Sequence, residues 1–175
     1  MKKVLILVVV ILGHFAARPA LAESTSQALI DWDLVGTWAV DCVTLTAPRI
    51  IVDASLSGSF YTSIRHANDG NGIKMYQSTR EIISAIRVTA DQIKITTIAV
   101  TTMVDGVVTT TGVGDSNEML YQRFGDKIRI MSDREMGSNL LFVSNGQSYF
   151  PVVSNNSTQM QPVGKGTLLS HKCPN

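Results

Sequence analysis

Short runs of β-branched residues separated by turn dipeptides constrain this chain's fold more than any other feature. Asp105-Gly106 and Gly125-Asp126 each lie between two such runs, and Asn145-Gly146 closes a further one. These dipeptides tolerate the positive φ angles that tight two-residue hairpins require. The pattern therefore predicts an all-β fold in which antiparallel strands are joined mainly by tight turns.

An open meander of strands would expose an unpaired strand at each of its two edges. Closure into a barrel removes both edges. We therefore predict a meander over residues 36–144 that closes into a barrel of about eight strands, as small antiparallel barrels do. A β-sandwich is the alternative architecture.

The segment 78–88 fits two patterns. Ser78 and Glu81 have the spacing of a helix capping box, and apolar residues follow them. Ile82, Ser84, Ile86 and Val88 also alternate with their neighbours as they would in a strand. The β-branched content of the segment favours the strand.

One predicted hairpin carries a cluster of threonines. Threonine suits the solvent-facing side of a strand, so we expect these hydroxyls at the surface. There they could also recognise a partner or a sugar. The cluster consists of Thr96, Thr97, Thr101, Thr102, Thr109, Thr110 and Thr111.

Residues 1–22 have the features of a secretory signal peptide. Lys2 and Lys3 precede an uninterrupted apolar run that is too short to span a bilayer, and cleavage is expected after Ala22. We expect a bacterial periplasmic or secreted protein without a transmembrane anchor. An N-terminal arm, 23–35, would precede the barrel, and 145–175 would form a long loop and tail.

The chain contains two cysteines, Cys42 and Cys173. An oxidising compartment favours their pairing. Neither a CxxC spacing nor a histidine cluster beside Cys42 indicates a metal site instead. We predict a disulfide that ties the tail back to the first strand.

Leu34-Val35-Gly36-Thr37-Trp38-Ala39-Val40 resembles the opening of lipocalin-like and fatty-acid-binding proteins, the calycins, whose first strand begins with Gly-x-Trp. The resemblance implies that Gly36 lets the chain bend into the barrel and that Trp38 plugs its closed end. It also implies an arginine packed over this tryptophan, for which Arg129 is the best-placed residue. The family's Thr-Asp-Tyr-like loop and its Arg-x-Tyr pair for a fatty-acid carboxylate are missing from the sequence, so the resemblance leaves the ligand class open.

Apolar side chains on separate predicted strands are expected to face the barrel interior. An eight-stranded barrel either fills itself with such side chains or holds one small ligand, and both outcomes show the same alternation. Methionine adapts to ligands of varied shape, which favours a ligand site, although ordinary core packing is the alternative. The predicted lining consists of Phe60, Met75, Ile86, Ile95, Met103, Met119, Tyr121 and Met131.

The sequence lacks the motifs of common catalytic and cofactor sites. No nucleophile elbow, phosphate loop or dinucleotide fingerprint is present, and after the leader only His66 and His171 remain as histidines. Three of the 15 basic residues lie in the leader, and the nearly neutral remainder argues against nucleic acid as a partner. We predict a non-catalytic protein without metal or cofactor that binds a small apolar ligand. The alternative is a cell-envelope interaction module, an inhibitor or assembly factor, with a filled barrel and a protein partner at segment 145–166.

Overall fold

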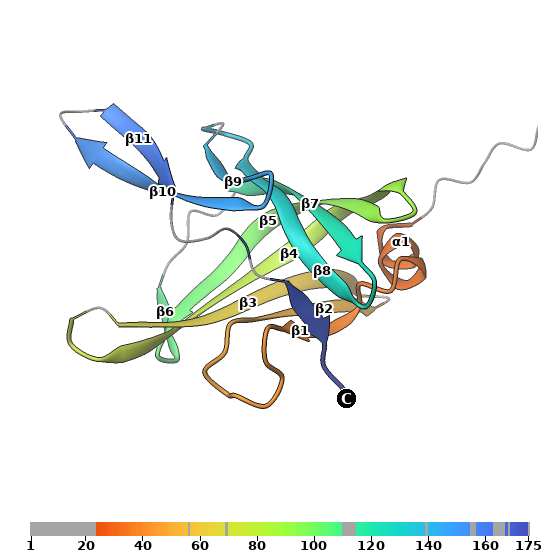
Figure 1. Ribbon diagram of the computed structural model, residues 1–175, viewed down its shortest axis with the longest axis horizontal. Coiled ribbons are helices and arrows are strands. Elements are labelled where there is room, and N and C mark those ends of the chain that lie inside the picture. The colour runs from red at the N-terminus through yellow and green to blue at the C-terminus, as the bar shows by residue number, and fades with distance from the viewer. Residues whose placement is uncertain are drawn as a thin grey trace, which may run out of the picture.

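The computed structural model describes residues 24–55, 57–68, 70–109, 115–138, 140–154, 157–162, 167 and 169–174, so the expected signal peptide lies outside the described residues. The described chain is all-β with one short helix (Figure 1). The elements are α1 (Thr25–Asp31), β1 (Gly36–Ala39), β2 (Arg49–Ser55), β3 (Gly58–Asn68), β4 (Ile73–Thr89), β5 (Gln92–Val104), β6 (Val107–Thr109), β7 (Ser116–Phe124), β8 (Lys127–Glu135), β9 (Leu141–Ser144), β10 (Gln147–Ser154), β11 (Ser157–Pro162) and β12 (Ser170–Lys172).

Eight strands close into an antiparallel barrel, which confirms the predicted fold class. Strands β1 to β5 follow one another as a meander, β7 pairs with β5, and β8 pairs with β7. The C-terminal strand β12 lies between β8 and β1 and is antiparallel to both. The end of the chain therefore supplies the strand that closes the sheet on itself and removes its open edges there.

The predicted tight hairpins are present at all three turn dipeptides. Gly125-Asp126 connects the paired residues Phe124 of β7 and Lys127 of β8, and Gly125 has a φ angle of 66°. Asp105 and Gly106, between β5 and β6, have φ angles of 49° and 81°. Asn145 and Gly146, between β9 and β10, have φ angles of 49° and 74°. Two consecutive positive φ angles are the requirement of a type I′ turn, whose twist matches that of the strands it joins.

Segment 78–88 is part of the long strand β4, which confirms the strand interpretation. The register between β4 and β5 shifts between Ile82 and Ser84. Ile82 and Ala85 are both buried, whereas Ile86 is 53% exposed. A bulge adds one residue and transfers the side chains after it to the other face of the strand. Ile86 therefore faces solvent, and its predicted place in the interior is wrong.

Helix α1 covers the end of the barrel that we call the closed end (Figure 1). Ser24 caps the helix by accepting a hydrogen bond from the backbone N–H of Gln27. Leu29 and Leu34 are completely buried in the core there. The indole N–H of Trp38 donates to the Leu34 carbonyl at 2.8 Å, so this tryptophan is buried without an unsatisfied polar atom. Its position matches the plug that the resemblance implies.

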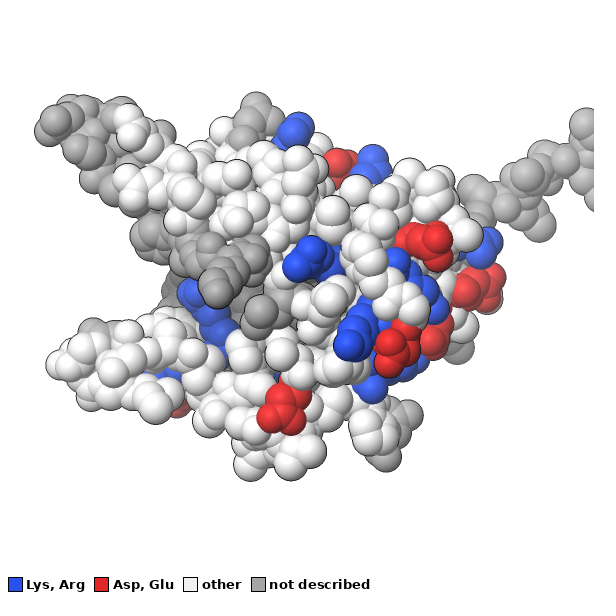
Figure 2. All heavy atoms as spheres, viewed as in Figure 1, with Lys and Arg blue, Asp and Glu red and all other residues white. Residues whose placement is uncertain are grey.

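Two ribbons project from the barrel on the side away from α1, and they flank a recess (Figures 1 and 2). The lower arm consists of the distal parts of β3, β4 and β5 with β6. The upper arm consists of β10 and β11, which are connected to β8 through β9. Segment 145–166 thus contains two strands where a long loop was expected. Pro151 and Pro162 lie in these strands, because proline is tolerated in edge and terminal strand positions.

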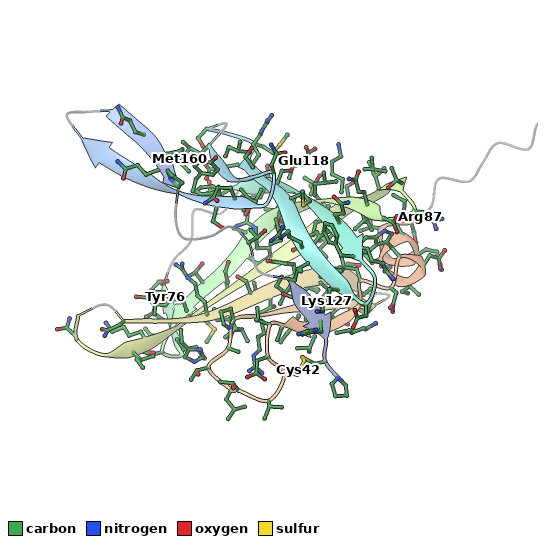
Figure 3. The ribbon with its side chains drawn as sticks, viewed as in Figure 1. Cys42, Tyr76, Arg87, Glu118, Lys127 and Met160 are labelled. Atoms are coloured by element: carbon green, nitrogen blue, oxygen red, sulfur yellow. A yellow bond between two sulfur atoms is a disulfide. The ribbon has the colours of Figure 1, made fainter. Side chains whose placement is uncertain are left out.

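Cys42 and Cys173 form the predicted disulfide, with their Cα atoms 5.4 Å apart (Figure 3). The backbone N–H of Cys173 also donates to the Thr37 carbonyl at 2.7 Å, so the bridge lies beside the β1–β12 pair. The bridge links residues 131 positions apart, and on the chain-entropy model such a loop stabilises the fold by at most about 5 kcal/mol. Such bonds persist in oxidising compartments outside the cytoplasm.

Candidate functional site

The barrel wall is incomplete at one place. Strand β8 pairs with β12 only at Lys127 and Ile128, and with β9 only from Ser132 onward. Between these points the described residues provide β8 with no strand partner on that side. Instead, the Thr167 hydroxyl donates to the Ile130 carbonyl at 2.7 Å. Strands β1 and β12 fill the space between β2 and β8, but both strands are short. Past their ends the barrel wall stays open between β2 and β8.

A pocket of about 490 Å³ opens at this gap, and we call it the mouth pocket. Its volume is within the range of about 300–1,000 Å³ that is usual for small-molecule sites. Seven of its lining residues have apolar side chains, and four are hydroxyl residues. The apolar residues are Val40, Pro48, Ile50, Ile64, Ile128, Ile130 and Val143, and the hydroxyl residues are Ser63, Ser148, Thr167 and Ser170.

Two buried tyrosines form the inner surface of the mouth pocket. Tyr61 of β3 and Tyr121 of β7 are 6% and 1% exposed, and the Tyr121 hydroxyl donates to Met119 Sδ at 3.9 Å. Burial raises the pKa of Tyr61 to about 12 and raises the pKa of Tyr121 well above its ordinary value. Both phenols are therefore neutral at physiological pH and offer the pocket polarity without charge.

Three arginines and one aspartate also line the mouth pocket: Arg49, Arg65, Arg129 and Asp133. Arg49 Nη2 donates to the carbonyls of Thr44 and Leu45. Arg129 Nε donates to a carbonyl at 3.0 Å. The Arg65 guanidinium lies 5.2 Å from the ring centre of Tyr76, which belongs to the lower arm (Figure 3). Carbonyls and rings do not neutralise a positive charge, and within the described ranges none of these arginines has an ion pair.

Asp133 belongs to a polar network that crosses the barrel interior. Its carboxylate accepts a hydrogen bond from Asn117 Nδ2, and Asn117 Oδ1 accepts one from Arg80 Nη2, both at 2.8 Å. Arg80 Nε donates to the hydroxyl of Thr97, which is completely buried. Burial raises the pKa of Asp133, while the bond from Asn117 and the charge of Arg80 oppose that rise. The expectation that Thr97 faces solvent is wrong, because Arg80 needs an acceptor inside the barrel.

The predicted lining residues divide between the core and the mouth pocket. Tyr121 lines the mouth pocket. Ile95 and Met119 are 0% and 2% exposed and pack in the core. Phe60 directly precedes the inward-facing Tyr61 on β3, so its side chain lies on the opposite face of the strand.

The other predicted methionines are Met75, Met103 and Met131, and two of them lie beyond the barrel. Met75 pairs with His66 and Met103 pairs with Val108, so both belong to the lower arm. Met131 lies at the register shift between β7 and β8 and is left without a cross-strand partner on β7. The predicted place in the barrel interior is therefore wrong for Met75 and Met103, whereas Met119 lies in the core. Strands that continue beyond the barrel remove Met75 and Met103 from the interior.

The cation over Trp38 is a lysine. Lys172 Nζ lies 5.8 Å from the ring centre of Trp38, and the two residues are directly opposite in the β1–β12 register. Arg129 instead bonds to Thr167, so its implied place over Trp38 is wrong. The reason is that β12, not β8, is the neighbour of β1. Arg123 forms a similar contact with Trp32, 4.6 Å from the ring centre.

A second hollow, of about 550 Å³, lies at the closed end and includes Trp32 and Arg123. Its two aspartates balance its two arginines in charge, so it does not select a ligand by charge. In the described part of the chain, no three His, Cys, Asp or Glu side chains gather as metal ligands. His171 contacts the Val40 carbonyl through Nε2 at 3.0 Å, and His66 lines neither hollow.

Comparison with known proteins finds no matching family model, no similar curated protein and no similar solved structure. The closed eight-stranded antiparallel barrel is consistent with a lipocalin-like fold. Within the described residues, no helix has the length and apolar character needed to cross a membrane.

Proposed function

We propose that this protein is a non-catalytic, lipocalin-like binding protein of the periplasm or the extracellular medium that holds a small ligand with an apolar body. The observation that supports the proposal is the mouth pocket, which has mainly apolar walls and opens through a gap between β2 and β8.

The ligand would occupy the mouth and not the whole barrel. Toward the closed end the interior is filled by Leu29, Leu34, Trp38 and Ile93, each no more than 3% exposed. Tyr61 and Tyr121 separate this solid core from the mouth pocket. A ligand of modest size would therefore enter between the two arms and rest on the tyrosine pair.

Two features support the proposed location. The disulfide between Cys42 and Cys173 is typical of an oxidising compartment. The leader expected over residues 1–22 would deliver the chain there.

A neutral apolar dye tests the proposal. N-phenyl-1-naphthylamine fluoresces in apolar sites, and we expect one saturable site per molecule of oxidised protein. Ser63→Phe would place a ring in the mouth pocket and abolish the signal. Thr62→Phe, one residue earlier and on the opposite face of β3, is the matched control and should bind as the unchanged protein does. Equal fluorescence from both variants, or no saturable signal from folded protein, would contradict the proposal.

The alternative is an interaction module that contacts an envelope protein through the upper arm. It is supported by β11, which ends the sheet order and pairs with β10 alone among the described strands. An exposed edge of this kind can accept a strand from a partner. Replacing residues 148–161 by a short turn should abolish capture of a specific envelope protein while the disulfide still forms. Unchanged capture would exclude the upper arm.

A further inference from the structure

We propose that the ligand of the mouth pocket carries a dianionic head, of the phosphate monoester type, bound by Arg49, Arg65 and Arg129. This inference rests on the proposed function, because it concerns the same pocket. The apolar walls would hold the body of the ligand, and the arginines would hold its head.

The three arginines reach the mouth pocket from different sides. Arg49 begins β2 and pairs with Ile64, the residue before Arg65 on β3, so these two arginines belong to neighbouring strands. Arg129 lies on β8, across the gap in the wall. Figure 2 shows basic atoms at the base of the recess between the arms. An anion in this recess would therefore have arginines of β2 and β3 on one side of the opening and Arg129 of β8 on the other.

The guanidinium groups retain unused donors. Arg129 uses Nε for its carbonyl bond, and Arg49 uses Nη2. Arg49 Nε is buried and has no hydrogen-bond partner among the described atoms. An arginine presents five N–H groups in a planar fork that matches phosphate oxygens two at a time. The pocket therefore has free guanidinium donors of the kind that a tetrahedral oxyanion accepts.

The charge balance favours a dianion over a monoanion. Asp133 is the one acidic residue among the lining residues, and the opposing charge of Arg80 acts on it from the interior. In the described part of the protein no carboxylate forms an ion pair with the three mouth arginines, and Asp41, which lies outside the pocket, interacts electrostatically with Arg49. With Asp41 set against one of the three arginines, two positive charges remain, and a dianion balances them where a single negative charge would not. Charges in such a partly dehydrated site interact more strongly than in water.

A series of decyl compounds isolates the head group. Decyl phosphate, decyl sulfate, decanol and decyltrimethylammonium share one apolar chain and would each be used to displace N-phenyl-1-naphthylamine at pH 8. A phosphate monoester, with a second pKa near 6, is a dianion at this pH, while the sulfate ester is a monoanion of similar shape. We expect decyl phosphate to bind about tenfold or more tightly than decyl sulfate, and the cation to bind most weakly. Higher salt should weaken phosphate binding and leave decanol unchanged.

Variants assign the preference to the mouth arginines. Arg129→Gln and Arg49→Gln should each weaken decyl phosphate binding about tenfold or more, the effect of losing a charge-assisted hydrogen bond, and leave decanol binding within about twofold. Arg134→Gln, an exposed arginine of β8 outside the pocket, is the control and should change neither. If all four compounds bind equally, or the variants retain the phosphate preference, this inference fails and the proposed function stands. If no compound displaces the dye because the dye does not bind, the proposed function itself fails.

Discussion

Substitution of Arg80 by methionine should destabilise the barrel strongly, because it removes the donor on which a buried network depends. Arg80 donates to the Thr97 hydroxyl, the Asp115 carbonyl and the Asn117 amide oxygen, each at 2.8 Å. Methionine has similar length and no donor, so all three acceptors lose their partner. Asp133, which is hydrogen-bonded to Asn117, also loses a nearby positive charge.

The expected loss of unfolding free energy at pH 7 is about 3–5 kcal/mol. Hydrogen bonds from a charged donor contribute roughly 1.5–3 kcal/mol each, but these three share one side chain, so their contributions do not simply add. Removing one partner of a buried charged pair costs about 3–5 kcal/mol. Arg80 is partly buried, which places the expectation toward the lower end of that range.

The loss should depend on pH. The pKa of Asp133 is raised in the folded protein, chiefly by burial, and Arg80→Met removes a charge that holds it down. A carboxyl whose folded pKa is above its unfolded value opposes folding when it is ionised, and this cost disappears as the pH falls through the folded pKa. The Arg80→Met loss should therefore be largest at pH 7 and smaller at pH 4.

Urea unfolding followed by tryptophan fluorescence at both pH values measures these losses. Adding Asp133→Asn to Arg80→Met should recover part of the stability at pH 7, because the uncompensated charge is gone. Arg134→Met is the control on an exposed arginine and should change stability by about 0.5 kcal/mol or less. A loss below about 1 kcal/mol at pH 7, or the same loss at pH 4, would refute the role of Arg80 as the donor of this network.

Three further substitutions test the elements that close the barrel. Exchanging both Cys42 and Cys173 for serine should lower the unfolding free energy by up to about 5 kcal/mol and make urea midpoints independent of reductant; a reductant effect that persists would disprove the link. Gly36→Ala should cost about 1–3 kcal/mol in the same assay, because its φ is 130° and a Cβ would lie 2.9 Å from Lys172 Cε. If Lys172→Ala fully rescues Gly36→Ala, the backbone conformation is not the cause. Trp38→Phe should cost about 1–3 kcal/mol by leaving the Leu34 carbonyl unpaired, and an unchanged midpoint would show that this bond contributes nothing.

The sequence allowed the local structure of the barrel to be predicted because its signals are local. Asp105-Gly106 and Asn145-Gly146 impose their turn geometry regardless of what surrounds them. The disulfide followed from composition and compartment, with two cysteines and one way to pair them. The strand that closes the barrel was not predicted, because residues 170–172 form a strand only by fitting between β8 and β1.

The site could not be predicted because it depends on register and on where strands end. The bulge between Ile82 and Ser84 reverses the alternation on which the placement of Ile86 relied. The mouth pocket exists because β1 and β12 stop early, and nothing in the residues of β8 indicates that gap. Arg49 and Arg65 carried no motif, and their significance appears only when the barrel brings them to one opening.

A methyl NMR titration with decyl phosphate tests most directly whether the opening between β2 and β8 is a ligand site. Saturable shifts are expected for the methyl groups of Ile50 and Ile130, which line the mouth pocket and pack against the core. Leu29 and Leu34, in the solid core at the closed end, should not move. Shifts confined to exposed residues such as Ile73 and Val107 at the tip of the lower arm, or no saturable shift at all, would contradict it.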